Sequence, residues 1–296
     1  MRYLSILFIF IVMFFVSSCV GGPATETNIG GIDMKFSLNQ PASPIREDSN
    51  FLVGVELTNN IPQYLEGELC VYDTPANSFG GIQEPDCIFV SLSPAEVVNE
   101  NKYPGTQFIQ FPGSGGSYSY RNLAMGVSST NINAKLKYAL QSTTRAEICL
   151  KKDPSADILN CNANAILSKG DLISDFAPVG VDRIEYSVVP EGNQNRLYVD
   201  IHLNKALQGE VISEDNKNKL KLDIKLVGTS SSFDCYPSNI EGIEMVETTR
   251  VVKCDGIISM GEQEFYHDSL VVTLDYTYST TISTGAIALK RKNEGI

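Results

Sequence analysis

The sequence contains no tryptophan and only two histidines, His202 and His267. Carbohydrate-binding modules often stack sugars on tryptophan, so its absence disfavours that class, although the 13 tyrosines could take its place. Serine and cysteine nucleophiles usually need a histidine base close by. His202 lies on the polar side of an expected strand and His267 in a short polar stretch, and neither is near a nucleophile motif. We therefore predict two surface histidines and no catalytic residues.

Positive charge is also scarce, with 23 Lys and Arg against 35 Asp and Glu, for a net charge of −12. Nucleic acids and anionic membranes attract basic proteins, so this excess of acid disfavours both as electrostatic partners. The C-x-x-C pairs of zinc sites and the D-x-[DN]-x-[DN]-G calcium loop are both absent from the sequence. We predict no nucleic-acid partner, no cofactor and no bound metal.

Residues 1–18 predict an export signal. Residues 4–16 are apolar except for one serine, a run shorter than the roughly 20 residues of a membrane-spanning helix and typical of a secretory signal. The sequence Val16-Ser17-Ser18-Cys19 resembles the lipobox of prokaryotic (bacterial or archaeal) lipoproteins. That resemblance implies cleavage before Cys19 and diacylation of its thiol, which would anchor the chain to a membrane. The alternatives are an uncleaved N-terminal helix, or ordinary cleavage with Cys19 as a spare thiol.

Residues 19–31 are rich in Gly, Thr and Pro and predict a flexible tether. A tether would hold a folded body away from the membrane surface. We therefore expect an extracytoplasmic lipoprotein that is anchored in a membrane, at the cell surface or in the periplasm.

The six cysteines beyond Cys19 predict three disulfides. An even number of cysteines in an exported chain is typical of a disulfide framework, although the sequence alone allows many pairings. Each disulfide would close a short turn-rich loop and contribute roughly 3 kcal/mol if unstrained. Proximity along the chain favours the pairs Cys70–Cys87, Cys149–Cys161 and Cys235–Cys254.

Alternating apolar and polar residues predict antiparallel strands along the whole body. The alternation is clearest in residues 51–57, 197–203, 219–226 and 270–278. No segment keeps helical periodicity over several turns, and the best candidate for a short helix is Cys161–Leu167. Many short strands separated by Gly, Pro and Asn indicate an all-β fold made of β-sandwiches.

A break in the alternation divides the body into two predicted domains. The break lies within SKGDLISDFAPVGVD (168–182), which carries Gly170 and Pro178. The predicted organisation is a lipoprotein signal peptide (1–18), a tether (19–31), a first β-sandwich domain (32–168), a linker (169–177) and a second β-sandwich domain (178–292).

The start of each predicted domain carries a resemblance. The segment GIDMKFSLNQPASPIREDSNFLVGVELTNN (31–60) resembles the opening of CARDB-type Ig-like domains of bacterial and archaeal surface proteins, with a short strand, a proline turn and an exposed strand. Residues 181–205 resemble the same unit more loosely, and the cysteine pairs are not part of the usual pattern. The resemblance implies two Ig-like antiparallel β-sandwich domains that serve as a spacer or adhesive module without an active site.

The glycine-rich stretch FPGSGGSYSY (111–120) lacks the Lys-Ser/Thr pair of a phosphate-binding loop. We read it as a long hairpin loop. Aromatic side chains near it could form a contact surface, because tyrosine offers a large amphipathic area at low entropic cost, or they could belong to the core. This candidate contact loop consists of Tyr103, Phe108, Phe111, Tyr118 and Tyr120.

These features predict a protein with a structural, adhesive or complex-assembly role through contacts with other envelope proteins, and not an enzyme. One alternative is a solute- or carbohydrate-binding lipoprotein, which a pocket lined by several tyrosines would favour. The missing α/β pattern disfavours the usual two-lobed form of that class. A more remote alternative is a hydrolase, which would need a cleft with two carboxylates or a histidine beside a nucleophile.

Overall fold

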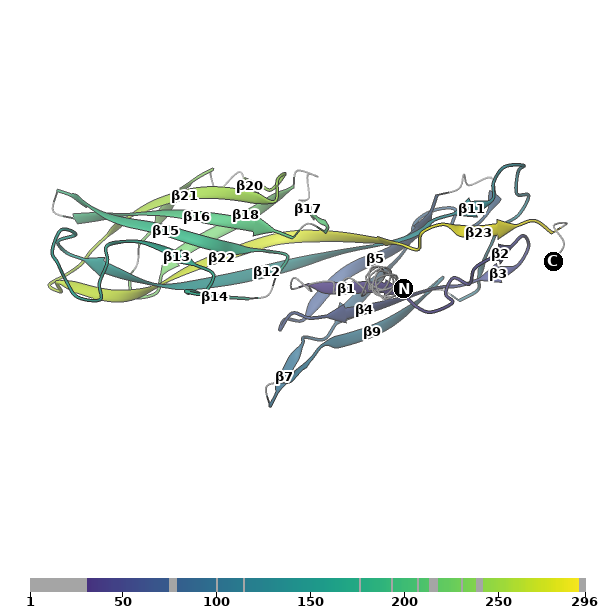
Figure 1. The fold of residues 1–296 in the computed structure, drawn as a ribbon, viewed down its shortest axis with the longest axis horizontal. Coiled ribbons are helices and arrows are strands. Elements are labelled where there is room, and N and C mark those ends of the chain that lie inside the picture. The colour runs from purple at the N-terminus through teal and green to yellow at the C-terminus, as the bar shows by residue number, and fades with distance from the viewer. Residues whose placement is uncertain are drawn as a thin grey trace, which may run out of the picture.

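The computed structural model describes residues 31–74, 79–99, 101–113, 115–175, 177–192, 194–206, 208–212, 218–229, 231–237 and 242–292. Every regular element among these residues is a β-strand, so the predicted all-β fold is confirmed. The strands form two lobes that lie end to end in an elongated molecule (Figure 1).

Two long strands run through both lobes. They are β12 (Ile132–Lys151) and β22 (Phe265–Ser283). They pair antiparallel without a break in register, from Asn133 opposite Ser283 to Lys151 opposite Phe265. Buried and exposed residues alternate along most of β12, so one apolar face serves the core of both lobes.

Lobe one is a sandwich built on one half of this ladder. Its first sheet extends from β12 through β5 (Leu65–Asp73) to the edge strand β6 (Asp86–Leu92). The second sheet has the order β1–β4–β9, with β1 (Ile32–Phe36), β4 (Val53–Asn59) and β9 (Gly105–Phe111). Because both sheets contribute buried side chains to the same core cluster, their inner faces pack against each other.

Short strands complete lobe one. Between β6 and β9 the chain forms a hairpin of β7 (Glu96–Val98) and β8 (Asn101–Tyr103), which stands out from the body (Figure 1). The far end is closed by the pair β10–β3 and the small sheet β11–β23–β2, in which β2 and β23 run parallel. These strands are β2 (Ile45–Arg46), β3 (Asn50–Phe51), β10 (Tyr118–Ser119), β11 (Ser129–Thr130) and β23 (Ile287–Lys290).

Lobe two is a sandwich on the other half of the ladder. One sheet has the order β13–β15–β16–β21–β19, formed by β13 (Asn164–Ser168), β15 (Val179–Glu191), β16 (Gln194–Lys205), β21 (Thr249–Ile258) and β19 (Phe233–Tyr236). The opposite sheet extends from β22 to β18 (Lys219–Leu226) and β20 (Ile243–Glu244). Two short strands pair with the long ladder, β14 (Leu172–Ser174) with β12 and β17 (Glu210–Ile212) with β22.

A single hydrophobic core extends through both lobes. At the waist between them, Tyr138 and Tyr278 face each other across the ladder with ring centroids 6.0 Å apart. Tyr276 packs edge-on against Tyr278, and Tyr138 also lies beside the backbone of Ile32. The waist is therefore a packed part of the core, and β1 begins there.

The predicted linker is not a boundary between two independent sets of paired strands. Residues 169–177 contain β14, which is hydrogen-bonded to β12. The last part of β22 pairs with the lobe-one half of β12, and β23 pairs with β11 and β2. The C-terminal end of predicted domain two therefore belongs to lobe one (Figure 1), because β22 is long enough to serve both sandwiches.

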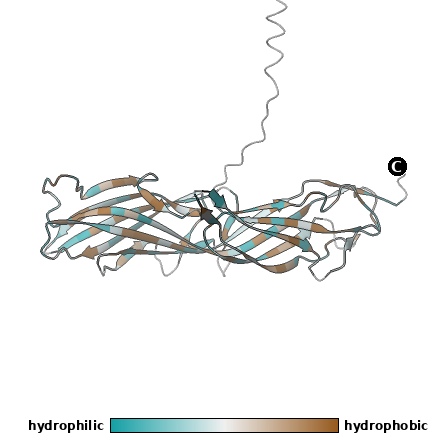
Figure 2. Cartoon of the chain, turned by 90° about the horizontal axis from the view of Figure 1, so that it is seen from below, coloured by the Kyte–Doolittle hydropathy of each residue, from teal (hydrophilic) through white to brown (hydrophobic). Residues whose placement is uncertain are grey.

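The predicted inward faces are confirmed. The apolar side chains of residues 51–57, 197–203, 219–226 and 270–278 that share one face are all buried. Figure 2 shows the resulting alternation of hydrophobic and hydrophilic positions along the strands of both lobes. Burying one such large side chain contributes about 1.5–3 kcal/mol, so this pattern supplies most of the driving force for the fold.

Two local predictions are wrong. The expected helix at Cys161–Leu167 is replaced by β13, which pairs with β15. The expected hairpin loop is also not a hairpin, because β10 pairs with β3 and not with β9. In both cases tertiary pairing with a distant strand overrides the local sequence signal.

Candidate functional site

The predicted lipidation residue Cys19, the signal peptide and nearly all of the tether lie outside the described residues. No helix within the described ranges is long and apolar enough to span a membrane. The search for a site therefore concerns the two lobes.

All three predicted disulfides are present. Cys70 lies directly opposite Cys87 on β5 and β6, and Cys235 lies directly opposite Cys254 on β19 and β21. The Cα atoms of each pair are 4.0 Å apart. Because β6 and β19 are edge strands, each bond ties a sheet edge to its inner neighbour.

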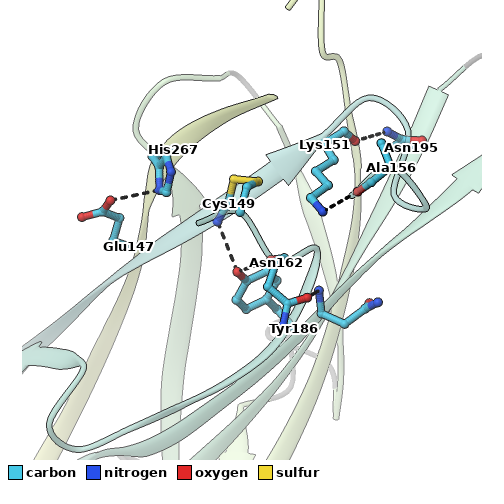
Figure 3. The surroundings of a disulfide bond; sticks show 10 residues. Glu147, Cys149, Lys151, Ala156, Asn162, Tyr186, Asn195 and His267 are labelled. Atoms are coloured by element: carbon cyan, nitrogen blue, oxygen red, sulfur yellow. Dashed lines mark hydrogen bonds and ion pairs between the residues drawn. A yellow bond between two sulfur atoms is a disulfide. The ribbon is translucent and has the colours of Figure 1, made fainter. Parts of the chain in front are cut away.

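The third disulfide joins Cys149 of β12 to Cys161, just before β13. Figure 3 shows the surroundings of Cys149. The Cys149 N–H donates a hydrogen bond to the Tyr186 hydroxyl at 3.2 Å, and that hydroxyl donates to the Asn162 carbonyl at 2.9 Å. Burial raises the pKa of Tyr186, so the hydroxyl keeps its proton for this second bond. The disulfide and the tyrosine together fasten the loop after β12 to the sheet of β15.

A buried lysine holds the same loop from its other side. The Lys151 ammonium donates to the Ala156 carbonyl at 2.8 Å, and the Asn195 amide donates to the Lys151 carbonyl at 2.7 Å (Figure 3). Both polar side chains are buried. Their hydrogen bonds satisfy groups that would otherwise be costly to bury, so this cluster has a structural role.

Each histidine has a carboxylate within hydrogen-bonding distance. His202 lies 3.0 Å from Glu185, and His267 lies 3.0 Å from Glu147. Cys149 faces His267 across the long ladder, but its sulfur is held in the disulfide and cannot act as a thiolate nucleophile. Among the described residues, neither histidine is hydrogen-bonded to a Ser or Cys side chain.

The structure divides the predicted contact loop. Tyr103 and Phe108 are exposed, with 57% and 53% of their surface accessible. Phe111 and Tyr120 are fully buried, so their assignment to a contact surface is corrected: they belong to the core. Phe111 lies on the inward side of β9, and Tyr120 stacks on Phe51 with ring centroids 5.2 Å apart.

Two carboxylates fix the tyrosines of this region. The Tyr118 hydroxyl donates to Asp86 at 2.5 Å, and the Tyr120 hydroxyl donates to Asp73 at 2.7 Å. Burial and the Asp86 charge raise the pKa of Tyr118. Burial also raises the pKa of Asp73, although its hydrogen bonds partly oppose the shift. Tyr118 is therefore a half-buried structural residue and not a free contact residue.

Sequence reasoning missed other exposed apolar side chains on the edge strands and the hairpin of lobe one. Phe89 of β6 is 68% accessible, and Val98 of the β7–β8 hairpin is also exposed. Together with Tyr103 and Phe108 they come from the consecutive elements β6 to β9, and we call this group the lobe-one edge. Strict alternation in β6, where Val90 and Leu92 are buried, is the signal that places Phe89 outward.

A shallow hollow of about 460 Å³ lies at the tip of lobe two, between the loops after β18 and β21 and the start of β22. Asp268 lines it and is only 7% exposed. One of its oxygens accepts the Gly228 and Ser269 N–H groups at 2.9 and 2.7 Å, while its Oδ2 has no partner. The buried Tyr266 hydroxyl also has no partner, and burial and the Asp268 charge raise its pKa.

One group of three potential metal donors occurs within the described ranges, formed by Glu68, Cys70 and Cys87. Its two sulfur atoms share a disulfide and are not available as thiolate ligands in this state. Comparison with models of known protein families and with curated proteins finds no match for the chain. The candidate functional features are therefore the lobe-one edge and the tip hollow.

Proposed function

We propose that this chain is an exported, lipid-anchored surface protein with a structural, adhesive or complex-assembly role. The sequence Val16-Ser17-Ser18-Cys19 and the tether after it support the anchor. Three disulfides are compatible with an oxidising compartment outside the cytoplasm.

The lobe-one edge is the observation that carries the functional part of this proposal. Aromatic residues are enriched at protein–protein contacts because one ring buries a large area at low entropic cost. Here Phe89 and Phe108 expose their rings on two edge strands, while most other large apolar side chains of these strands are buried. A protein partner at either strand would remove the exposed ring of that strand from water.

Each lobe is proposed to be an Ig-like sandwich of the CARDB type, used as a spacer or contact module. The observed strand, turn and strand at residues 32–59 support that assignment. The shared strands β12 and β22 make the spacer one continuous body.

The anchor has a direct test. Intact-mass analysis of the membrane-extracted protein is expected to give a chain that begins at an acylated Cys19, with the other six cysteines oxidised. A Cys19→Ser variant is expected to leave the membrane fraction. A mature chain that starts elsewhere, or full membrane retention of the variant, would contradict the anchor.

The contact role has a separate test. Photo-crosslinkers placed at Phe89 and Phe108 in intact cells are expected to capture protein, whereas one at Tyr198, which is exposed on lobe two, is the matched control. Equal capture from all three positions would contradict a specific contact at the lobe-one edge.

A second candidate function is the binding of a small polar solute, and the tip hollow favours it. Asp268 Oδ2 and the Tyr266 hydroxyl both lack partners there, and the volume lies near the lower end of the range for ligand pockets. Calorimetric titration with sugars and amines is the test. Binding that an Asp268→Asn variant loses would favour this candidate, and no heat from any solute would remove it.

A further inference from the structure

Strand β9 is an unprotected sheet edge. It pairs with β4 on one side and with no described strand on the other. Its residues, Gly-Thr-Gln-Phe-Ile-Gln-Phe, include no charge and no proline, and the flanking prolines, Pro104 and Pro112, lie outside the strand. Natural proteins usually protect exposed edges with charged residues, proline or bulges, because a bare edge pairs readily with another strand. An edge without these features indicates a strand that has a partner.

The free backbone groups of β9 can be assigned from its neighbour. The Gly54 N–H donates to the Gln40 carbonyl, and the Gly54 carbonyl accepts the Ser37 N–H, so both groups of Gly54 point away from β9. The N–H and C=O groups of the residues on either side of Gly54 must then point toward β9. By the same alternation Thr106, Phe108 and Gln110 direct their N–H and C=O groups to the open edge. No described residue hydrogen-bonds to these groups.

Of the two bare edges of lobe one, β9 is the one at which two copies of this acidic chain can meet with the least repulsion. The protein carries a net charge of −12, so two copies repel each other over most of their surface. The edge of β9 is neutral, and the nearest acid on β4, Glu56, is neutralised by Lys35 at 2.8 Å. The other bare edge of lobe one, β6, lies beside two acids of β5, Glu66 and Glu68, of which Glu68 faces Lys137 of β12.

We propose that two copies of the chain pair antiparallel through β9, with the two-fold axis at Phe108. This register places Phe108 opposite Phe108 of the second copy and Thr106 opposite Gln110. In this register, each of the three residues whose backbone groups point to the open edge lies opposite another such residue of the second copy. The exposed Phe108 rings then pack on each other, and the two β1–β4–β9 sheets become one continuous sheet.

This inference rests on the contact role proposed for the lobe-one edge, because it assigns Phe108 to a second copy of the chain, and it does not depend on Cys19. Cysteine substitutions in the full-length chain, extracted in detergent and mildly oxidised, test the register. Phe108→Cys is expected to give a disulfide-linked dimer, because facing residues of a hydrogen-bonded pair have Cα atoms about 5.5 Å apart, within disulfide range. Gln110→Cys is the matched control, since its two copies would lie about 13 Å apart in this register.

Mixing two variants avoids any change at Phe108. Thr106→Cys and Gln110→Cys copies are each expected to stay uncrosslinked alone and to crosslink when mixed. Crosslinking of Gln110→Cys alone at the rate of Phe108→Cys, or no crosslinking of the mixture, would overturn the proposed register.

The oligomeric state gives an independent measurement. Light scattering of the full-length protein in excess detergent is expected to show a dimer, and Phe108→Lys is expected to convert it to a monomer by placing two like charges at the axis. Thr58→Lys, on the inner strand β4 of the same sheet, is the control and is expected to remain dimeric. A monomeric natural chain at every concentration would refute the proposal, whatever the outcome for the lipid anchor.

Discussion

The hydroxyl of Tyr276 holds both backbone groups of Val179. It accepts the Val179 N–H at 3.1 Å and lies 3.2 Å from the Val179 carbonyl, to which it donates. Tyr276 belongs to β22 at the waist, and Val179 is the first residue of β15. This contact fixes where the sheet of lobe two begins relative to the long ladder.

Removing this hydroxyl should destabilise the protein. A Tyr276→Phe variant leaves the buried Val179 N–H without its partner, and we expect a loss of about 1–3 kcal/mol in the free energy of unfolding. Urea unfolding followed by circular dichroism measures it. Tyr198→Phe, on the exposed face of β16, is the control and should change the free energy by less than about 0.5 kcal/mol. Equal stability of the two variants would show that the contact at Val179 has no net effect.

The waist tyrosines predict unfolding at alkaline pH. Burial raises the pKa of Tyr278 to about 12 and also raises the pKa values of Tyr138 and Tyr276. The folded state binds these protons more tightly than the unfolded state, so their contribution to stability is complete below about pH 10 and is lost as the pH rises through the raised values. Tyrosinate absorbance and circular dichroism should therefore change together in one cooperative step. Titration of Tyr138, Tyr276 and Tyr278 before any loss of structure would contradict this prediction.

The disulfides should differ in their rate of reduction. Cys87 is exposed on the outer face of β6, whereas Cys149 and Cys161 are both buried. A thiol reductant must reach a sulfur atom directly, so limited reduction of the folded protein should open Cys70–Cys87 first and Cys149–Cys161 last. Alkylation followed by mass spectrometry gives the order. Early labelling of Cys161 would indicate that the tip of lobe two opens more readily than its packing implies.

The predicted first domain should not fold alone. A fragment of residues 32–168 lacks β22 and β23. In it, β12 loses its pairing with β22, which covers nearly its whole length, and lobe one loses its closing strand β23. We expect a disordered circular dichroism spectrum for the fragment and a single thermal transition for residues 32–292. A cooperative transition of the fragment, with native-like β content, would refute the single shared core.

Local alternation was sufficient to place many side chains correctly, because period two directly distinguishes the two faces of a strand. It located Val53, Val55 and Leu57 in the core, and the short separations along the chain gave the disulfide pairs. It could also have separated Phe108 from Phe111, which lie on opposite faces of β9.

The pairing partner of each strand could not be predicted from the sequence in the same way. Nothing local in residues 265–283 reveals that one half pairs in lobe two and the other in lobe one, because both halves have the same alternation. The sequence break at residues 169–177 therefore predicts a boundary, although the chain crosses back to lobe one much later. Tyr120 is a similar case, since its burial depends on Asp73 and Phe51, which are distant in sequence.

The unbroken register of β12 and β22 also has a mechanical consequence. The paired segment, from Asn133 to Lys151, spans about 60 Å at the usual rise of a strand, and it passes the waist without a bulge. A molecule built on such a continuous two-stranded ladder resists bending at its middle. The loop at Gly261 and the C-terminal strand β23 therefore keep a fixed separation and orientation. Whatever one end touches, the other end is held at a set distance from it.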